Sequence, residues 1–248
     1  MIKCALETIN ETWCKMKSLN ESFEESGISQ VHLYKLSEII KLRDFTRQWI
    51  SNNFLSQGVK EKIPNNLSRY HDWCASNQIP HQNLFSAPYR FTTPPKNIST
   101  MLLNSNLFKI FAALKLRNPK IIDEGMGWLG YRIIRPGMND GYPMSAKNWG
   151  ASKGAYSFWV PLFGFGAKYS LHYVSSSHKK DYKNFLPSEG KFTKDELRLD
   201  PSEIVDISSQ YVRPGNGLFY HPRTLHTENV ESGKKTRINL EFRFLFDE

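Results

Sequence analysis

The sequence predicts a mainly β protein, with helices in its N-terminal part and a β-sandwich or barrel in its C-terminal part. After Gly125 the chain consists of short segments rich in apolar and aromatic residues, each followed by glycine, proline or small polar residues. Short strands in succession, without intervening helices, favour a sandwich or barrel over a parallel α/β sheet. The expected strands cover residues 128–134, 155–163, 169–176, 203–208, 217–221 and 236–246.

The N-terminal part has the periodicity of a helix. Between Ser29 and Gly58, apolar residues recur at spacings of three and four, as they do on one face of a helix. These residues are Leu36, Ile39, Leu42, Phe45 and Trp49. A second helix is expected over residues 99–117. The segment 61–96, rich in proline, asparagine and aromatic residues, is expected to be an ordered loop.

Length and composition favour one domain with a substantial core. The chain has 248 residues, of which 13% are aromatic, and no linker or internal repeat divides it. We expect a single domain over residues 1–248, in which a helical and loop part, 1–120, packs on a β core, 121–248.

The cysteines and the N-terminal segment predict a cytoplasmic protein. Cys4, Cys14 and Cys74 are odd in number and lack the close spacing of a zinc site, so we expect reduced thiols. The first residues mix charges with apolar side chains, unlike a signal peptide, and no run of apolar residues is long enough to span a bilayer. No membrane association is expected.

The net charge of +9 raises the question of nucleic-acid binding. The basic residues are scattered, and no helix-turn-helix, zinc-finger or RNA-binding signature accompanies them. We therefore expect a solvated basic surface and a small-molecule substrate rather than a nucleic-acid partner, with a preference for an anionic substrate left open.

The segment GLFYHPRTLHTENVESGKKTRINLEFRF (217–244) contains the most informative residues. If Ser232 and Gly233 form a two-residue hairpin turn, Arg237 falls opposite Glu228, and alternation places His226 on the same face as Arg237. That arrangement suits a metal ligand beside a guanidinium that binds a carboxylate. The alternative is an ordinary hairpin with a surface arginine.

This segment resembles the C-terminal signature of the phytanoyl-CoA-dioxygenase-like branch of the iron(II)/2-oxoglutarate oxygenases. Two upstream segments resemble the same family in the expected order, YSFWVPLFGF and SLHYVSSSHKKDY. The resemblance covers residues 128–246 and implies a double-stranded β-helix of the jelly-roll or cupin-like type. It also implies iron(II) and 2-oxoglutarate as cofactors, with His226 as the distal metal ligand and Arg237 as the anchor of 2-oxoglutarate.

The chain departs from this family in one essential feature. The family has a His-x-Asp pair before the strand that reads FWVPL here, and it completes the iron site with the distal histidine. Residues 135–159 contain no histidine, and the closest alignment places Met144 and Ala146 at the two positions. Three interpretations remain: other residues such as Asp140 and His172 rebuild the site, the protein binds no metal, or the alignment differs locally.

Other polar residues have more ordinary interpretations. Lys147 could replace the charge of a metal with an ammonium group, although a surface lysine is the favoured interpretation. His178 is expected to stabilise its turn, and His32 to lie on a solvated helix face. His71 and His81 lie in the proline-rich loop and could line a pocket mouth, although nothing requires it. The aromatic residues of the predicted strands are expected to be mainly core, namely Trp149, Tyr156, Phe158 and Trp159.

Two functional hypotheses follow. The first is an oxygenase-type enzyme that uses iron and 2-oxoglutarate to hydroxylate a small polar metabolite or a sugar, and the presence of His226 and Arg237 favours it. The second is a non-redox relative that binds a carboxylate- or phosphate-bearing small molecule without iron, and the missing His-x-Asp pair favours it.

Overall fold

The computed structural model describes residues 19–81, 96–103, 106–121, 129–136, 149–152, 154–166, 169–180, 186–187, 196–199, 207–228 and 233–247. The predictions made for Asp140, Met144, Ala146 and Lys147 lie outside these residues. Within them, no helix is both long enough and apolar enough to cross a membrane.

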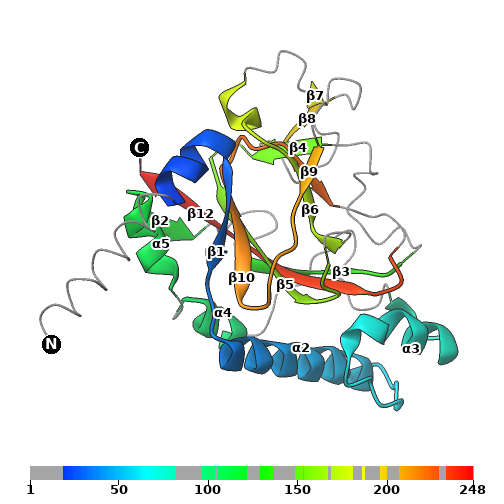
Figure 1. Cartoon of the computed structure of the whole chain (residues 1–248). Coiled ribbons are helices and arrows are strands. Elements are labelled where there is room, and N and C mark those ends of the chain that lie inside the picture. Colours follow the sequence, from blue (N-terminus) through cyan, green and yellow to red (C-terminus); the bar gives the residue numbers. More distant parts are fainter. Residues whose placement is uncertain are drawn as a thin grey trace, which may run out of the picture.

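The described residues include twelve strands, which form two antiparallel sheets (Figure 1). The first sheet has the order β1-β10-β5-β12-β2, with β3 also paired to β12. Its strands are β1 Ile28–His32, β2 Arg117–Ile121, β3 Leu129–Ile134, β5 Tyr156–Phe163, β10 Asn216–Tyr220 and β12 Arg237–Asp247. The second sheet has the order β7-β8-β4-β11-β6-β9. Its strands are β4 Trp149–Ser152, β6 Leu171–Val174, β7 Leu186–Pro187, β8 Glu196–Leu199, β9 Ile207–Ser209 and β11 His226–Glu228.

The chain passes repeatedly from one sheet to the other. In chain order, β3, β5, β10 and β12 lie in the first sheet, and β4, β6, β9 and β11 lie in the second. The two sheets face each other, because one buried apolar cluster takes Trp159 and Leu218 from the first sheet and Leu171 from the second. The expectation of a mainly β fold with helices is confirmed.

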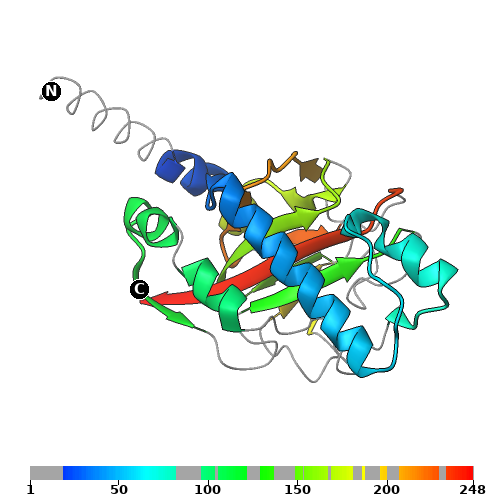
Figure 2. The ribbon, with the colours of Figure 1, turned by 90° about the horizontal axis from the view of Figure 1, so that it is seen from below.

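Helices cover the other face of the first sheet. They are α2 Leu36–Ser56, α3 Tyr70–Ser76, α4 Lys96–Leu103 and α5 Leu107–Ala113, with a short 3₁₀ turn η1 Leu67–Arg69. A second 3₁₀ turn, η4 Ser177–Lys179, follows β6. Figure 2 shows α2 running diagonally across this face. Its buried residues recur every three or four positions, namely Ile39, Leu42, Thr46, Ile50 and Phe54. The large core therefore lies between the helices and the first sheet.

The strands of the first sheet are apolar on both faces because both faces are covered. Every residue of β3 is buried, as are seven of the eight residues of β5. Phe158, Val160 and Leu240 pack toward the helices, whereas Leu171 and Leu218 lie between the sheets. All five are buried.

The N-terminal elements differ from the prediction. The helix expected from Ser29 begins only at Leu36, because residues 28–32 pair with β10 as an edge strand. His32 therefore lies on a strand, although it is exposed as expected. The helix expected over 99–117 is two short helices followed by β2. The strand expected over 203–208 is described as β9, Ile207–Ser209.

Candidate functional site

β12 has two chemically different faces because side chains alternate along a strand. Toward the helices it presents four buried apolar residues, Ile238, Leu240, Phe242 and Phe244. The interleaved residues belong to the face toward the second sheet. Three of them are buried and polar, namely Arg237, Asn239 and Glu241. A candidate site on β12 therefore lies between the sheets.

A buried ion pair occupies this inner face. Arg132 of β3 pairs in register with Asn239, so it shares the inner face of the sheet. Its Nε lies 3.0 Å from Oε1 of Glu241, and its Nη2 donates to Oε2 at 3.1 Å. Asn239 Nδ2 also donates to Oε1 of Glu241, at 3.0 Å. Burial alone would raise the pKa of Glu241, but Arg132 and Arg243 outweigh it, so the pKa is lowered and the carboxylate is ionised.

Arg237 lies at the start of β12, paired with Ile134 of β3. It is only 2% exposed, and its Nη1 donates to the backbone oxygen of Tyr169 at 3.2 Å. Burial and the nearby charge of Arg132 lower its pKa to about 9, while Glu241 acts in the opposite direction. The guanidinium is therefore still charged at neutral pH, in a setting that disfavours its charge.

His226 begins β11 on the opposite sheet. Its Nδ1 donates to the backbone oxygen of Thr224 at 2.8 Å, which leaves the lone pair on Nε2. Its ring centroid lies 4.6 Å from that of Tyr220, a residue of the first sheet. Burial lowers its pKa to about 4, so the imidazole is neutral at pH 7, the form that binds metals.

The structure places His226 and Arg237 around the same ion pair. Glu241 and Arg132 influence the pKa of both residues. We call Arg132, Arg237, Asn239, Glu241 and His226 the inner polar cluster. Its five members include two guanidinium groups and one carboxylate, in addition to the neutral imidazole, so their summed charge is positive.

The predicted hairpin between these two residues is wrong. β11 pairs with β4 and β6, whereas β12 pairs with β2, β3 and β5, so the two strands belong to different sheets. Arg237 lies opposite Ile134 rather than Glu228. The two site residues face the same interior because the sheets face each other, not because their strands are neighbours.

The strands beside His226 do not supply the other ligands of an iron site. In the register of the second sheet, His226 lies opposite Gly150 of β4 and Tyr173 of β6. Gly150 has no side chain, and a phenol is not part of the two-histidine, one-carboxylate set. His172, proposed from the sequence as a ligand, pairs with Thr227 and so belongs to the opposite face of its strand from Tyr173. We withdraw it.

The described residues therefore do not form a complete iron site. They contain no group of three or more histidines, cysteines, aspartates or glutamates that could hold a metal ion. Glu241 is engaged by Arg132 and Asn239. A carboxylate ligand fits this region better, because the surplus charge is positive and Arg237 can present a fork of donors.

The remaining histidines lie away from the inner polar cluster or play supporting roles. His71 Nδ1 lies 3.0 Å from Thr236 Oγ1, on the residue before Arg237, and His81 Nδ1 lies 3.1 Å from the hydroxyl of Tyr70. His178 Nε2 donates to the backbone oxygen of Glu24 at 3.2 Å and thereby ties its turn to the helical residues 19–26.

Arg132 and Glu241 were not identified from the sequence. A signal was present, because Arg132 is the one charged residue of the strand LGYRII, and Glu241 lies between two apolar residues in RINLEFRFLFD. Charged residues are seldom fully buried unless they are paired, so two such strands predict a buried ion pair.

Comparison with known proteins gives the fold. No protein-family model matches the sequence, and no curated protein matches it significantly. Solved structures do match. SnoK, a non-heme, α-ketoglutarate-dependent carbocyclase from nogalamycin biosynthesis, aligns with a TM-score of 0.56 and 12% identity over 93% of this chain and 83% of its own.

Two other structures align similarly. EvdMO1 gives a TM-score of 0.57 and 12% identity over 94% of this chain and 50% of its own. ThoJ, a non-heme monooxygenase, gives a TM-score of 0.52 and 13% identity over 92% of this chain and 77% of its own. The chain shares the fold of these proteins. At this level of identity the likeness concerns the fold, and the function is argued from the inner polar cluster.

Proposed function

We propose that this protein binds 2-oxoglutarate, or a small carboxylate of the same shape, between its two sheets, with Arg237 as the anchor. The observation that carries the proposal is a buried guanidinium within a cluster whose charge is positive. A ligand carboxylate would balance that charge, and an arginine fork is the geometry that proteins use for carboxylates. α-Ketoglutarate, another name for 2-oxoglutarate, is the co-substrate of SnoK.

We further propose that the eight central strands form a double-stranded β-helix, as in the phytanoyl-CoA-dioxygenase-like branch. The strand order supports this. The order is β3-β12-β5-β10 in the first sheet and β4-β11-β6-β9 in the second. In each of these sets of four, the strand that comes last in the chain lies between the first and the second. This shared order is expected when a paired ribbon winds into two facing sheets. In such a fold the last two strands, β11 and β12, bring their first residues, His226 and Arg237, to the interior.

The leading function is an oxygenase-type reaction that uses iron(II) and 2-oxoglutarate on a small polar metabolite or a sugar. His226 Nε2 is the metal ligand in this proposal, and bound iron would supply oxygen activation. The described residues contribute this one imidazole, so further ligands would have to come from elsewhere, Asp140 of the segment 137–148 being the carboxylate nearest in the sequence to the missing pair. Tyr220 fixes the orientation of the imidazole, and Arg237 that of the carboxylate.

The second candidate is a relative that binds the carboxylate without redox chemistry. The pairing of His226 with Gly150 favours it, because Gly150 has no side chain that could donate to a metal at this position. In this case Arg132 and Arg237 provide the binding, and the neutral His226 acts as a hydrogen-bond partner of the ligand.

Calorimetric titration with 2-oxoglutarate, with and without iron(II) under anaerobic conditions, tests the proposal. We expect binding in both conditions, and lack of binding in both would overturn it. Oxygen-dependent release of succinate separates the two candidates. If the protein binds one equivalent of iron and releases succinate, and if His226→Ala loses both properties, the oxygenase function is established. 2-Oxoglutarate binding without iron uptake or succinate establishes the non-redox function.

A further inference from the structure

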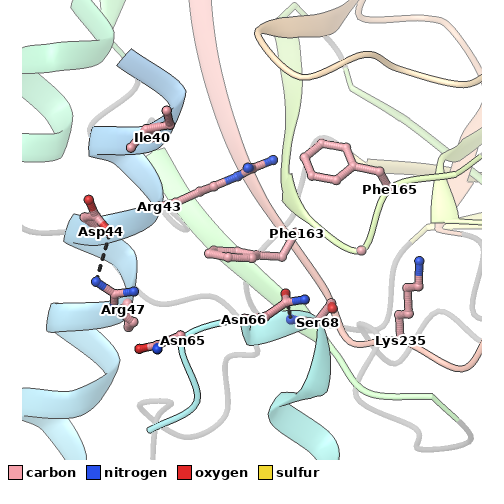
Figure 3. A pocket seen from close by; sticks show the side chains of 11 residues that line it. Ile40, Arg43, Asp44, Arg47, Asn65, Asn66, Ser68, Phe163, Phe165 and Lys235 are labelled. Atoms are coloured by element: carbon pink, nitrogen blue, oxygen red, sulfur yellow. Dashed lines mark hydrogen bonds and ion pairs between the residues drawn. The ribbon is translucent and has the colours of Figure 1, made fainter. Parts of the chain in front are cut away.

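A cavity of about 460 Å³ lies between α2 and the end of the first sheet (Figure 3). Its walls come from α2, from the segment before α3, from the residues that end β5, and from Lys235, which precedes β12. A cavity of this size is in the range that holds small ligands. We call it the α2 pocket.

The α2 pocket is separate from the inner polar cluster. Phe163, one of its wall residues, pairs with Ile238 and belongs to the core on the helix side of the sheet. Arg237 is directed to the other side. A ligand of the α2 pocket would therefore occupy a second site, and the inference does not depend on the proposed function.

Positive charge predominates in the walls. Arg43, Arg47 and Lys235 line the pocket together with a single carboxylate, Asp44. That carboxylate pairs with Arg47, whose Nη2 lies 2.9 Å from Oδ1 of Asp44. Among the described residues, no carboxylate forms an ion pair with Arg43 or Lys235. The pocket thus has two cationic groups available for an anion.

Arg43 is held in position before any ligand arrives. Its Nε donates to the backbone oxygen of Leu162 at 2.7 Å. Its guanidinium carbon lies 5.6 Å from the ring centroid of Phe163 and 4.8 Å from that of Phe165. Partial burial lowers the pKa of Arg43. A partly desolvated cation with a fixed orientation loses little side-chain entropy when it binds an anion.

Neutral donors and apolar surface complete the walls. Asn66 Oδ1 accepts from the backbone nitrogen of Ser68 at 3.1 Å, so its amide nitrogen is directed away from that bond. Asn65 and Ser68 add further polar groups, and the rings of Phe163 and Phe165 supply flat apolar surface on the opposite side. Figure 3 shows Arg43 reaching from α2 toward Phe165, with Lys235 across the pocket.

We propose that the α2 pocket binds a phosphate group that is attached to a flat ring, as in an aryl phosphate. Arg43 and Lys235 contact the phosphate oxygens from two sides, and Asn66 adds a neutral donor. The ring packs against the two phenylalanines. A free inorganic phosphate would use only the polar half of the pocket.

Titration of the full chain with phenyl phosphate and with inorganic phosphate tests this proposal. We expect phenyl phosphate to bind more tightly, by about tenfold, because it also buries its ring. Lys235→Ala and Arg43→Gln should each weaken phenyl phosphate binding by about tenfold, the effect of losing one charge-assisted contact. Thermal unfolding of each variant checks that it is folded.

Lys234→Ala is the matched control, since it removes the same charge from an adjacent exposed residue that does not line the pocket. Its affinity should match that of the wild type. Equal losses in Lys234→Ala and Lys235→Ala would overturn the proposal, because they would indicate attraction to a basic surface. Absence of phenyl phosphate binding, or equal affinity for inorganic phosphate, would also overturn it. Because Lys235 is exposed, this test stands even if Arg43→Gln fails to fold.

Discussion

The two faces of β12 use their buried positions differently. On the helix side, Phe242 stacks on Phe158 with ring centroids 4.8 Å apart, within a continuous apolar core. On the inner side, one residue away, Glu241 is bound by Arg132 and Asn239. Both faces are equally hidden from solvent. The difference is therefore one of chemistry and not of exposure.

This difference indicates which face stabilises the fold and which is available for binding. Burying aromatic surface is strongly favourable, whereas a buried ion pair offsets a large desolvation cost and often adds little net stability. A protein that needed only stability would be expected to place apolar residues on both faces. Under the proposed function, the inner polar cluster is the face that binds the ligand.

The largest effect is expected from the helix-side face. Phe242→Ala should lower the free energy of unfolding by about 3–5 kcal/mol, since it removes a fully buried ring and leaves a cavity. Urea unfolding followed by circular dichroism measures it. Leu245→Ala, at a partly exposed position of the same strand, should cost less than about 1 kcal/mol. Similar losses in both would contradict the assignment of the core.

On the inner face, removing one partner of the Arg132–Glu241 ion pair should lower the free energy of unfolding, but replacing both partners should not. Glu241→Gln leaves Arg132 buried without its carboxylate and should cost about 3 kcal/mol. The double variant Arg132→Met and Glu241→Leu should recover most of this loss. A double variant as unstable as the single one would show that the ion pair itself stabilises the fold.

The neutral His226 should make the protein sensitive to acid in a defined range. Its ordinary pKa of 6.5 is lowered to about 4 in the folded state, so only the unfolded chain binds this proton between these values. The free energy of unfolding should therefore fall as the pH falls from 6.5 to about 4, by roughly 1–3 kcal/mol, and this residue should add no loss below that range.

His221, whose pKa is also lowered to about 4 by burial, acts in the same direction. The contribution of His226 is therefore the difference between wild type and His226→Gln, measured by urea unfolding at pH 7 and pH 4. The variant should lose less stability over this range. An equal loss in both proteins would mean that His226 is protonated in the folded state as readily as in the unfolded chain.

Much of the fold could be predicted because its central strands have unmistakable composition. β3, β5 and β12 are apolar runs bounded by turn residues, and the structure places them within one or two residues of the prediction. β1 was missed because the predicted helix was extended from Leu36 back to Ser29, although Val31 and Leu33 have the two-residue spacing of a strand. Only pairing with β10 decides its conformation, and tertiary pairing is not encoded in local periodicity.

The candidate site could be predicted in part. Alternation gives the parity of side chains along a strand but does not give the partner strand, so the predicted pairing of Arg237 with Glu228 failed. The family resemblance led to His226 and Arg237, which the structure places around one ion pair. Arg132 and Glu241 were identified only from the register in which the strands pair.

The central claim is that Arg237 anchors a carboxylate between the sheets, and calorimetry with 2-oxoglutarate tests it most directly. Arg237→Ala should weaken binding by about 2–3 kcal/mol, and Arg237→Lys should restore only part of it, because an ammonium cannot present the same fork. Arg117→Ala, an exposed arginine of the same sheet, should bind like the wild type. Unchanged affinity in folded Arg237→Ala would contradict the account.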